Sequence, residues 1–503
     1  MRPIYIVEEK GFRDMIKVFD PRYSLPSRKT FSTTVIPRMY DIVREQTVLP
    51  RLERATSVAI TTDMWTSRAS DQYIGVTVHF IDDDWKMGSF TLENRELPPP
   101  HDNEHIAEVL RAIIAQWALE NKVSAVVTDN ATNITKAVRE GLSLPNIPCF
   151  GHTLNLVVKA GLKCRGIQTT LARCSKLVEF VHRSAKAKYC LASHQKNLNV
   201  PEHKLIQDVE TRWGSTHDML RRILEQQQPI SNLLIETKRK ELDLSDREVS
   251  IAEQLVELLQ PLKEITESLS SESQVTISNI IPTICMLEHI FEVDGNDLPD
   301  IVAVKRQMSE KLAQYYVEQD IQDFLSISAF LDGRFKRLLF FQEEKRARVC
   351  DVVARELTEN ISAERRMHEP ASDIDIDGES EGQPKTKKQK SLAYLISQTI
   401  GELDEEENLP RTSPESEARD EINRYLREPK VRMSGDPLSW WKLEEGKFPT
   451  LAAMARKYLC TPATSVPSER LFSVAGNIVT AKRSLLTPEN VGMLTFLHDN
   501  TPK

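Results

Sequence analysis

Paired cysteines are missing from this sequence. Its 503 residues include seven cysteines, but no two of them have the C-x-x-C spacing of a zinc or redox motif. Long apolar runs are missing too, since none approaches the roughly 18 residues of a membrane span. The first ten residues are too charged for a secretory signal. These absences predict reduced thiols in the cytosol or nucleus, no structural zinc and no membrane partner.

A basic net charge is also missing, although the charge is unevenly distributed. The net charge is −8, and residues 369–420 alone hold 14 acidic and 6 basic residues, which accounts for the whole excess. Their runs of Asp, Glu and Lys predict a solvated, disordered loop. Within it, Lys385-Thr-Lys-Lys-Gln-Lys is either a nuclear-import signal or part of a soluble linker.

One basic segment interrupts the otherwise neutral remainder. Residues 156–190 carry eight Lys and Arg residues against one acid, Glu179. A local basic face can neutralise DNA phosphates even in an acidic protein. A solvated helix surface has the same composition, so both interpretations stand. The candidate DNA-binding side chains here are Lys159, Lys163, Arg165, Arg173, Lys176 and Arg183.

Hydrophobic periodicity divides the chain into one α/β part and longer helical parts. Residues 12–50 have a helical period, punctuated by Pro26 and Pro37. Residues 155–360 are predicted to be almost wholly helical. Between these parts, we predict strands at 58–63, 73–81, 85–97, 123–129 and 147–150, and a helix at 103–119.

The strands have the order of a ribonuclease-H-like core. Strict alternation places Ile74, Val76, Val78 and Phe80 on one face, and the acidic turn at 82–84 closes an antiparallel hairpin. The order βββαβαβ predicts an α/β fold of this type. One carboxylate of such a core is carried by the first strand, and another stands at the end of the fourth.

Three carboxylates are candidates for a metal site. Asp63 and Asp129 occupy the two strand positions, and Glu469 lies in the first turn of a predicted C-terminal helix. Each has an ordinary alternative role as a turn residue, a helix cap or a partner of the helix dipole. Together they could hold Mg²⁺ or Mn²⁺, because hard cations prefer oxygen ligands and a metal pair suits phosphodiester chemistry.

The strings around these acids resemble the hAT superfamily of DNA transposases and the host proteins descended from them. The strings are Ile60-Thr-Thr-Asp-Met-Trp-Thr-Ser, Val126-Val-Thr-Asp-Asn-Ala-Thr-Asn and Thr461-Pro-Ala-Thr-Ser-Val-Pro-Ser-Glu-Arg-Leu-Phe-Ser-Val-Ala-Gly. The resemblance implies a ribonuclease-H-like core interrupted by a large all-α insertion. It also implies that Asp63, Asp129 and Glu469 are the metal ligands of a DDE-type site.

Two further strings match the family. Cys149-Phe-Gly-His-Thr-Leu-Asn implies that His152 assists with the phosphates of the transferred strand; the alternative is a core cysteine beside a helix-capping histidine. Thr211-Arg-Trp-Gly-Ser-Thr implies that Trp213 stacks on an unpaired base, which is worth about 1–3 kcal/mol. The alternative is a tryptophan that anchors the helical insertion on the core.

Residues 436–500 resemble the C-terminal dimerisation region of the family over its whole length. The resemblance implies a homodimer or a higher oligomer, although an apolar helical stripe is more often part of a core than of an interface. The residues assigned to dimerisation are Trp440, Trp441, Leu451, Met454, Leu471 and Phe472. The expected organisation is a helical lead-in (1–54), the first part of the core (55–215), an all-helical insertion (216–368), the acidic loop (369–420) and the dimerisation region (421–503).

One family feature has no counterpart in this sequence. Many relatives carry an N-terminal BED zinc finger, and the chain contains no such spacing of cysteines and histidines. Three functions follow as hypotheses. The first is a transposase-derived nuclear protein that dimerises and binds DNA, the second is an active cut-and-paste transposase, and the third is a structural protein with relic carboxylates.

Overall fold

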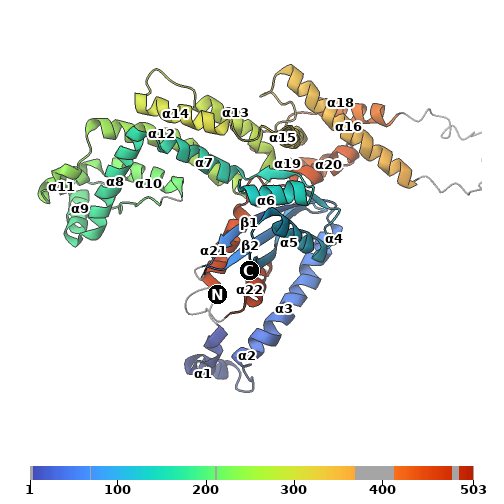
Figure 1. Ribbon diagram of the computed structural model, residues 1–503, viewed down its shortest axis with the longest axis horizontal. Coiled ribbons are helices and arrows are strands. Elements are labelled where there is room, and N and C mark those ends of the chain that lie inside the picture. Colours follow the sequence, from blue (N-terminus) through green and yellow to red (C-terminus); the bar gives the residue numbers. More distant parts are fainter. Residues whose placement is uncertain (1–3, 68–69, 210–211, 369–412, 479–485, 502–503) are drawn as a thin grey trace, which may run out of the picture.

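The computed structural model describes residues 4–67, 70–209, 212–368, 413–478 and 486–501. It has a mixed α/β architecture with one five-stranded sheet and many helices. In Figure 1 the sheet lies where a long helical cross-bar meets a stem of N- and C-terminal helices. Most of the predicted acidic loop lies outside the described residues, but its last part, from Pro414 on, begins a helix.

The sheet contains all five predicted strands. They are β1 (Val58–Thr66), β2 (Gln72–Ile81), β3 (Met87–Glu96), β4 (Val123–Thr128) and β5 (Asn146–Pro148). The order in the sheet is β3-β2-β1-β4-β5. The first three strands are antiparallel, and β4 and β5 run parallel to β1. Ile81 pairs with Met87, which confirms the hairpin predicted at the acidic turn.

The predicted alternation along the strands is confirmed by their packing. Ile74, Val76, Val78 and Phe80 are buried in one apolar cluster with helix α5 (Asn103–Gln116). Residues that point to the opposite face, such as Ala125, belong to a second and larger cluster. Because a strand exposes alternate residues to opposite faces, each face of the sheet has a core of its own.

The stem begins with short helices, and residues 28–54 then form one unbroken run of helical elements. Its elements are η1 (Ile4–Glu8), α1 (Lys10–Phe19), α2 (Arg28–Thr30), η2 (Phe31–Val35), α3 (Ile36–Val43), η3 (Arg44–Val48) and α4 (Leu49–Arg54). Pro37, expected to punctuate this helical segment, lies in the first turn of α3, and the run of helical elements continues through it. A wide π-helical turn precedes Pro37 and another precedes Pro50, and such turns accommodate a residue that has no N–H to donate.

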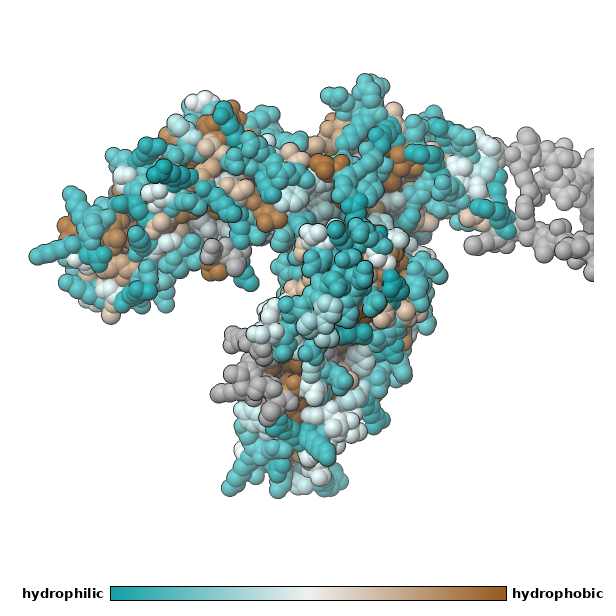
Figure 2. All heavy atoms as spheres, in the orientation of Figure 1, coloured by the Kyte–Doolittle hydropathy of each residue, from teal (hydrophilic) through white to brown (hydrophobic). Residues whose placement is uncertain are grey.

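The cross-bar is all-helical, as the sequence predicts. It follows α6 (Thr132–Lys136) and η4 (Ala137–Gly141) and comprises α7 (Phe150–Leu162), α8 (Arg165–Arg183), α9 (Ala185–Asn197), α10 (Trp213–Glu225), α11 (Gln227–Glu236), η5 (Lys240–Leu242), α12 (Asp246–Leu269), η6 (Ile277–Asn279), α13 (Ile280–Ile290), α14 (Pro299–Leu312), α15 (Gln319–Leu331) and α16 (Glu343–His368). Helices α8 to α11 form the end farthest from the sheet in Figure 1. Hydrophilic residues cover most of the face of this end that Figure 2 shows.

The C-terminal helices return to the sheet. They are α18 (Pro414–Arg427), α19 (Pro437–Glu444), α20 (Pro449–Leu459), α21 (Val466–Ile478) and α22 (Pro488–Asn500). Thr487 caps α22 and Pro488 occupies its first turn, as predicted. Helix α21 contacts β1, β2 and β3, and α22 contacts β3 and α3. The end of the chain therefore packs on strands formed hundreds of residues earlier.

None of the helices in the described ranges combines the length and the apolar character that crossing a bilayer requires. All seven cysteines are free thiols. Four of them are buried, which is typical of cysteines that pack as small apolar side chains.

Candidate functional site

The three candidate carboxylates come from three separate elements. Asp63 lies within β1 rather than at its end, and it pairs with Gly75 of β2. Asp129 directly follows the last residue of β4. Glu469 is in the first turn of α21, as predicted, and is exposed. Asp63 and Asp129 are each partly buried.

Backbone hydrogen bonds connect the elements that carry these acids. The amide of Cys149 donates to the carbonyl of Thr128 at the end of β4 (2.7 Å). The amide of Phe150 donates to Ala463 (2.9 Å), and the Cys149 sulfur accepts from the amide of Ser465 (3.2 Å). The segment that leads into α21 is therefore fixed to the end of β4 and the start of α7.

The pKa of Asp63 responds to the charges of the other two acids. Burial raises the pKa of Asp63 to about 7, helped by the negative charge of Asp129 and, to a smaller extent, of Glu469. Only the Met64 amide, which donates to Asp63 (2.7 Å), opposes this shift. No basic side chain in the described residues contributes to it, so the negative charge of the cluster is not compensated.

The donor chemistry of this cluster fits a divalent cation. Carboxylate oxygens are the ligands that Mg²⁺ and Mn²⁺ prefer, and an uncompensated group of acids attracts a cation. Asp129 is held by the Ala131 amide, which donates to its Oδ1 (3.0 Å). However, no three His, Cys, Asp or Glu side chains in the described ranges form a ready-made set of metal ligands.

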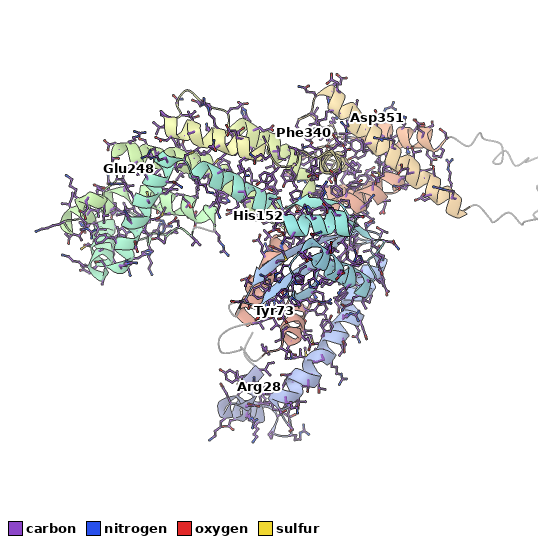
Figure 3. The ribbon with its side chains drawn as sticks, in the orientation of Figure 1. Arg28, Tyr73, His152, Glu248, Phe340 and Asp351 are labelled. Carbon is purple, nitrogen blue, oxygen red and sulfur yellow. The ribbon has the colours of Figure 1, made fainter. Side chains whose placement is uncertain are left out.

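His152 lies where the helical cross-bar meets the sheet (Figure 3). The sequence suggested that this histidine could cap α7, and that interpretation was wrong. Cys149 is the cap, because its sulfur accepts from the backbone amide of His152 (3.4 Å). The imidazole of His152 is part-buried and has no hydrogen-bond partner in the described residues. Its ring is therefore available, and its action on phosphates stays a prediction.

Trp213 begins α10 and is only 6% exposed. Its ring belongs to the larger apolar cluster, together with Leu177 and Leu220. This position agrees with the alternative in which the tryptophan anchors the helical part of the chain. Stacking on a base would require the ring to leave this core, so that role stays a prediction.

The candidate DNA-binding cations differ in their surroundings. Lys163, Arg165 and Lys176 are exposed, and none is in an ion pair with the described residues. Lys159 is half-buried on α7. Lys159 is on α7, Lys163 directly follows α7, and Arg165 and Lys176 are on α8; these helices lead from the sheet to the far end of the cross-bar (Figure 1).

The two remaining candidates are held by other residues. Arg183 is exposed but forms an ion pair with Glu179 (2.5 Å). Arg173 forms an ion pair with Glu248 (2.8 Å) and donates to the carbonyl of Asp243 (2.5 Å). Arg173 therefore ties α8 to the start of α12, and its contacts are those of a structural residue.

Most residues assigned to dimerisation are buried within the single chain. Trp441, Leu451, Met454 and Leu471 are at most 1% exposed. Trp441 donates to the carbonyl of Leu331 (2.8 Å). These side chains hold the C-terminal helices on the rest of the protomer, so a partner would have to contact other residues of the same helices.

The other two assigned residues are only partly covered. Trp440 packs edge-on against Trp441, with ring centroids 5.0 Å apart. Phe472 stacks on Trp65 of β1 at 5.9 Å. Their partly exposed rings leave room for a role in self-association, which stays a prediction.

Sequence reasoning missed a buried group of polar side chains beneath α21. Thr61, Thr77, His79 and Ser468 are at most 4% exposed and are joined by hydrogen bonds. The available signal was the polar character of Thr61, Thr77 and His79 at strand positions that face a helix. The contribution of Ser468 could not be found, because its partner is 407 residues away.

Comparison with known families agrees with this arrangement. Residues 61–151 match the ZBED1 RNase-like domain, and residues 147–258 match the ZBED1 RNase-like helical domain. Residues 421–501 match the hAT family C-terminal dimerisation region. The first match includes Asp63, Asp129 and Cys149, and the third includes Glu469.

Relatives along the whole chain include both transposases and BED-finger proteins. Human zinc finger BED domain-containing protein 4 is 29% identical over all of this chain and 42% of its own length. A putative AC transposase of Zea mays is 27% identical over 99% of this chain and 63% of its own length. The rice BED-finger protein RICESLEEPER 2 is 24% identical over 99% and 72%. The chain thus spans 42% and 63% of the first two relatives. These matches confirm the resemblance: the chain carries a hAT C-terminal dimerisation region and RNase-like domains of the ZBED1 type, and its relatives include transposases and BED-finger proteins.

Proposed function

We propose that this chain is a transposase-derived nuclear protein that self-associates through its C-terminal region and binds DNA. The observation that carries the proposal is the match of residues 421–501 to the hAT dimerisation region. Three antiparallel strands followed by two parallel ones support a ribonuclease-H-like core. Helices α7 to α16, between β5 and the C-terminal helices, would be its all-α insertion.

The DNA-binding part of the proposal rests on the exposed cations of α7 and α8. Lys163, Arg165 and Lys176 are free to neutralise phosphates, and each phosphate contact steepens the fall of log K with log salt by about 0.9. Replacing all three with Ala should weaken binding to a mixed-sequence duplex and reduce the slope by nearly 3. Fluorescence anisotropy over a salt series measures both quantities.

A matched control separates these contacts from general charge effects. Lys10, Lys17 and Arg38 are exposed cations on the stem, and their replacement with Ala removes the same charge. This control should change the slope much less than the α7–α8 variant. Equal effects of the two variants would contradict a DNA-binding face on α7 and α8.

Cut-and-paste transposition is the second candidate, and the uncompensated acids favour it. A bound divalent cation would supply Lewis-acid stabilisation of the attacking and leaving oxygens of a phosphodiester. The chain's own part is to hold Asp63 and Asp129 on adjacent strands and to bring Glu469 to them on α21. The unpartnered imidazole of His152 would contact a phosphate.

Strand cleavage tests this second candidate. Asp63→Asn and Glu469→Gln should each reduce Mg²⁺- or Mn²⁺-dependent nicking of duplex DNA to background while the thermal midpoint is retained. Asp83→Asn, in an exposed turn, is the control and should cleave like the unmodified chain. Cleavage that persists in both site variants would refute the site assignment. A chain that folds and binds DNA but never cleaves it would leave the acids as relics.

We also propose that the protein acts in the nucleus, which rests on its proposed DNA partner. The lysine cluster from Lys385 to Lys390, the candidate import signal, lies outside the described residues. A fluorescent fusion of the full chain should accumulate in nuclei. Replacing the four lysines with Gln should shift the fusion toward the cytosol. An unchanged distribution would show that this cluster is not the import signal.

A further inference from the structure

A buried hydrogen-bond network of three hydroxyl groups and one imidazole lies between α21 and the sheet. Ser468 Oγ is 2.7 Å from Thr61 Oγ, which is 2.5 Å from Thr77 Oγ. Thr77 Oγ in turn is 2.9 Å from Nε2 of His79. All four side chains are at most 4% exposed. These hydrogen bonds connect one helix and two strands at the centre of the molecule.

The burial of side chains in a core does not by itself explain why these positions are polar. Val or Ala at the same positions would fill similar space, and buried polar groups cost free energy unless they are hydrogen-bonded. Apolar contacts are non-directional, whereas hydrogen bonds fix distance and angle. These buried hydrogen bonds therefore define where α21 lies along the strands more narrowly than apolar packing would.

These hydroxyl groups connect β1, which carries Asp63, to α21, which carries Glu469. Thr61 is two residues before Asp63, so the two side chains project from the same face of β1. Ser468 directly precedes Glu469 in the first turn of α21. The hydrogen bond between Ser468 and Thr61 thus joins the backbone next to one acid to the strand that carries the other.

At its other end, the network keeps the hydrogen bond between Thr77 and His79 over the whole working pH range of the protein. Burial lowers the pKa of His79 to about 3, so the ring stays neutral near neutral pH. Its second nitrogen, Nδ1, is buried and has no partner in the described residues. Thr77 is therefore the residue that holds the ring, and the network ends at His79.

The packing of α21 beside this network is close. Gly75 pairs with Asp63 across the strands, and a Cβ atom at Gly75 would lie 2.7 Å from side-chain atoms of Leu471 and of Phe472. The helix therefore rests directly on the backbone of β2. A shift of α21 by a fraction of an ångström would change the position of Glu469 relative to Asp63.

We propose that Ser468, Thr61 and Thr77 are positioning residues that fix the first turn of α21, and with it Glu469, relative to the strand that carries Asp63. This inference rests on the proposed role of these acids as a site for divalent cations. Outer partners that orient metal ligands typically contribute 10- to 100-fold to affinity. Loss of one hydroxyl should therefore weaken cation binding by roughly that factor.

Paired substitutions separate the hydroxyl from the shape of each side chain. Thr61→Val keeps the shape and removes the hydroxyl, whereas Thr61→Ser keeps the hydroxyl and removes a methyl group. Mn²⁺ binding to the full chain, measured by electron paramagnetic resonance, should weaken roughly 10- to 100-fold for Thr61→Val and for Ser468→Ala. Thr61→Ser should bind Mn²⁺ like the unmodified chain. Ser473→Ala, at an exposed position of the same helix, should also leave binding unchanged.

Two reference measurements make each result decisive. A thermal midpoint for every variant shows whether it folds, and Asp63→Asn shows whether Mn²⁺ uses the carboxylates. If Asp63→Asn binds Mn²⁺ like the unmodified chain, the proposed cation site itself fails. If Asp63→Asn loses binding but Thr61→Val and Ser468→Ala do not, only the positioning role is overturned. A larger loss in Thr61→Ser than in Thr61→Val would also overturn it, because packing would then be responsible.

Discussion

His79 shows how one buried residue links pH to stability. Its pKa is about 3 in the folded chain, and the ordinary value is about 6.5. Between these values the unfolded chain binds a proton that the folded chain excludes. Stability is therefore complete above pH 6.5 and is lost as the pH falls, by about 1.4 kcal/mol per unit for this residue.

The resulting prediction concerns mild acid. Lowering the pH from 6.5 to 5 should cost roughly 2 kcal/mol of unfolding free energy through His79. His79→Gln should remove this part of the pH dependence, whatever its effect at neutral pH. Urea unfolding at the two pH values measures the difference, with His289→Gln at an exposed position as the control. An equal pH dependence in the chain with His79→Gln would show that the buried ring is not responsible.

Single residues also show what the sequence could and could not provide. Glu469 was correctly placed in the first turn of a helix, because that pattern is local. The burial of Trp213 and the pairing of Arg173 with Glu248 depend on which helices pack together. The sequence identified Cys149 and His152 together, but only the geometry shows which of them caps α7.

At the scale of elements, the close packing of α21 on β2 is the feature of the site that is most sensitive to substitution. Gly75→Ala would place a Cβ atom against Leu471 and Phe472 and so push the helix from the strand. Overpacking of this kind typically costs about 1–3 kcal/mol. We expect a lower thermal midpoint and weaker Mn²⁺ binding.

Gly446 provides the control for this prediction. A Cβ atom at Gly446 would meet nothing within 4 Å, so Gly446→Ala should leave both the midpoint and Mn²⁺ binding unchanged. If Gly75→Ala behaves like this control, α21 does not rest on β2 as closely as described.

A buried carboxylate also fixes the start of α20. Glu421 of α18 accepts the backbone amide of Leu451 (2.9 Å) in the first turn of that helix. Glu421→Ala removes this cap and should cost about 1–2 kcal/mol of unfolding free energy. Glu421→Gln keeps an acceptor and should cost less, and Asp420→Ala at the exposed neighbouring position is the control. Chemical unfolding that shows no difference between Glu421→Ala and Asp420→Ala would contradict the capping role.

The elements differ in how well their sequences predict them. The strands were predicted because alternation has a period of two residues and needs no knowledge of neighbours. The helical character of residues 12–50 was predicted from its period, but the π-helical turns before Pro37 and Pro50 were not, because they leave no clear local signal. Asp63 was expected at a strand end, but β1 continues to Thr66 because β2 pairs with it along its whole length.

At the scale of the whole molecule, the C-terminal region has two tasks. Leu471 and Phe496 are buried against earlier parts of the chain, so these helices complete the protomer. Deleting residues 436–503 would therefore expose the core, and an insoluble product would carry no information about dimerisation. Self-association has to be measured on the intact chain.

Light scattering coupled to size-exclusion chromatography gives that measurement. We expect a mass of at least two copies of the 57.4 kDa chain, because residues 421–501 match the hAT dimerisation region. A mass of one copy throughout the accessible concentration range would contradict self-association through this region.

We propose that three distant segments of the chain assemble one carboxylate site for divalent cations. The most direct test is a Mn²⁺ titration of the intact protein and of Asp63→Asn, Asp129→Asn and Glu469→Gln, followed by electron paramagnetic resonance. We expect the unmodified chain to bind Mn²⁺ and each substitution to weaken this binding. Binding that is absent from the unmodified chain, or equal in all four proteins, would contradict it.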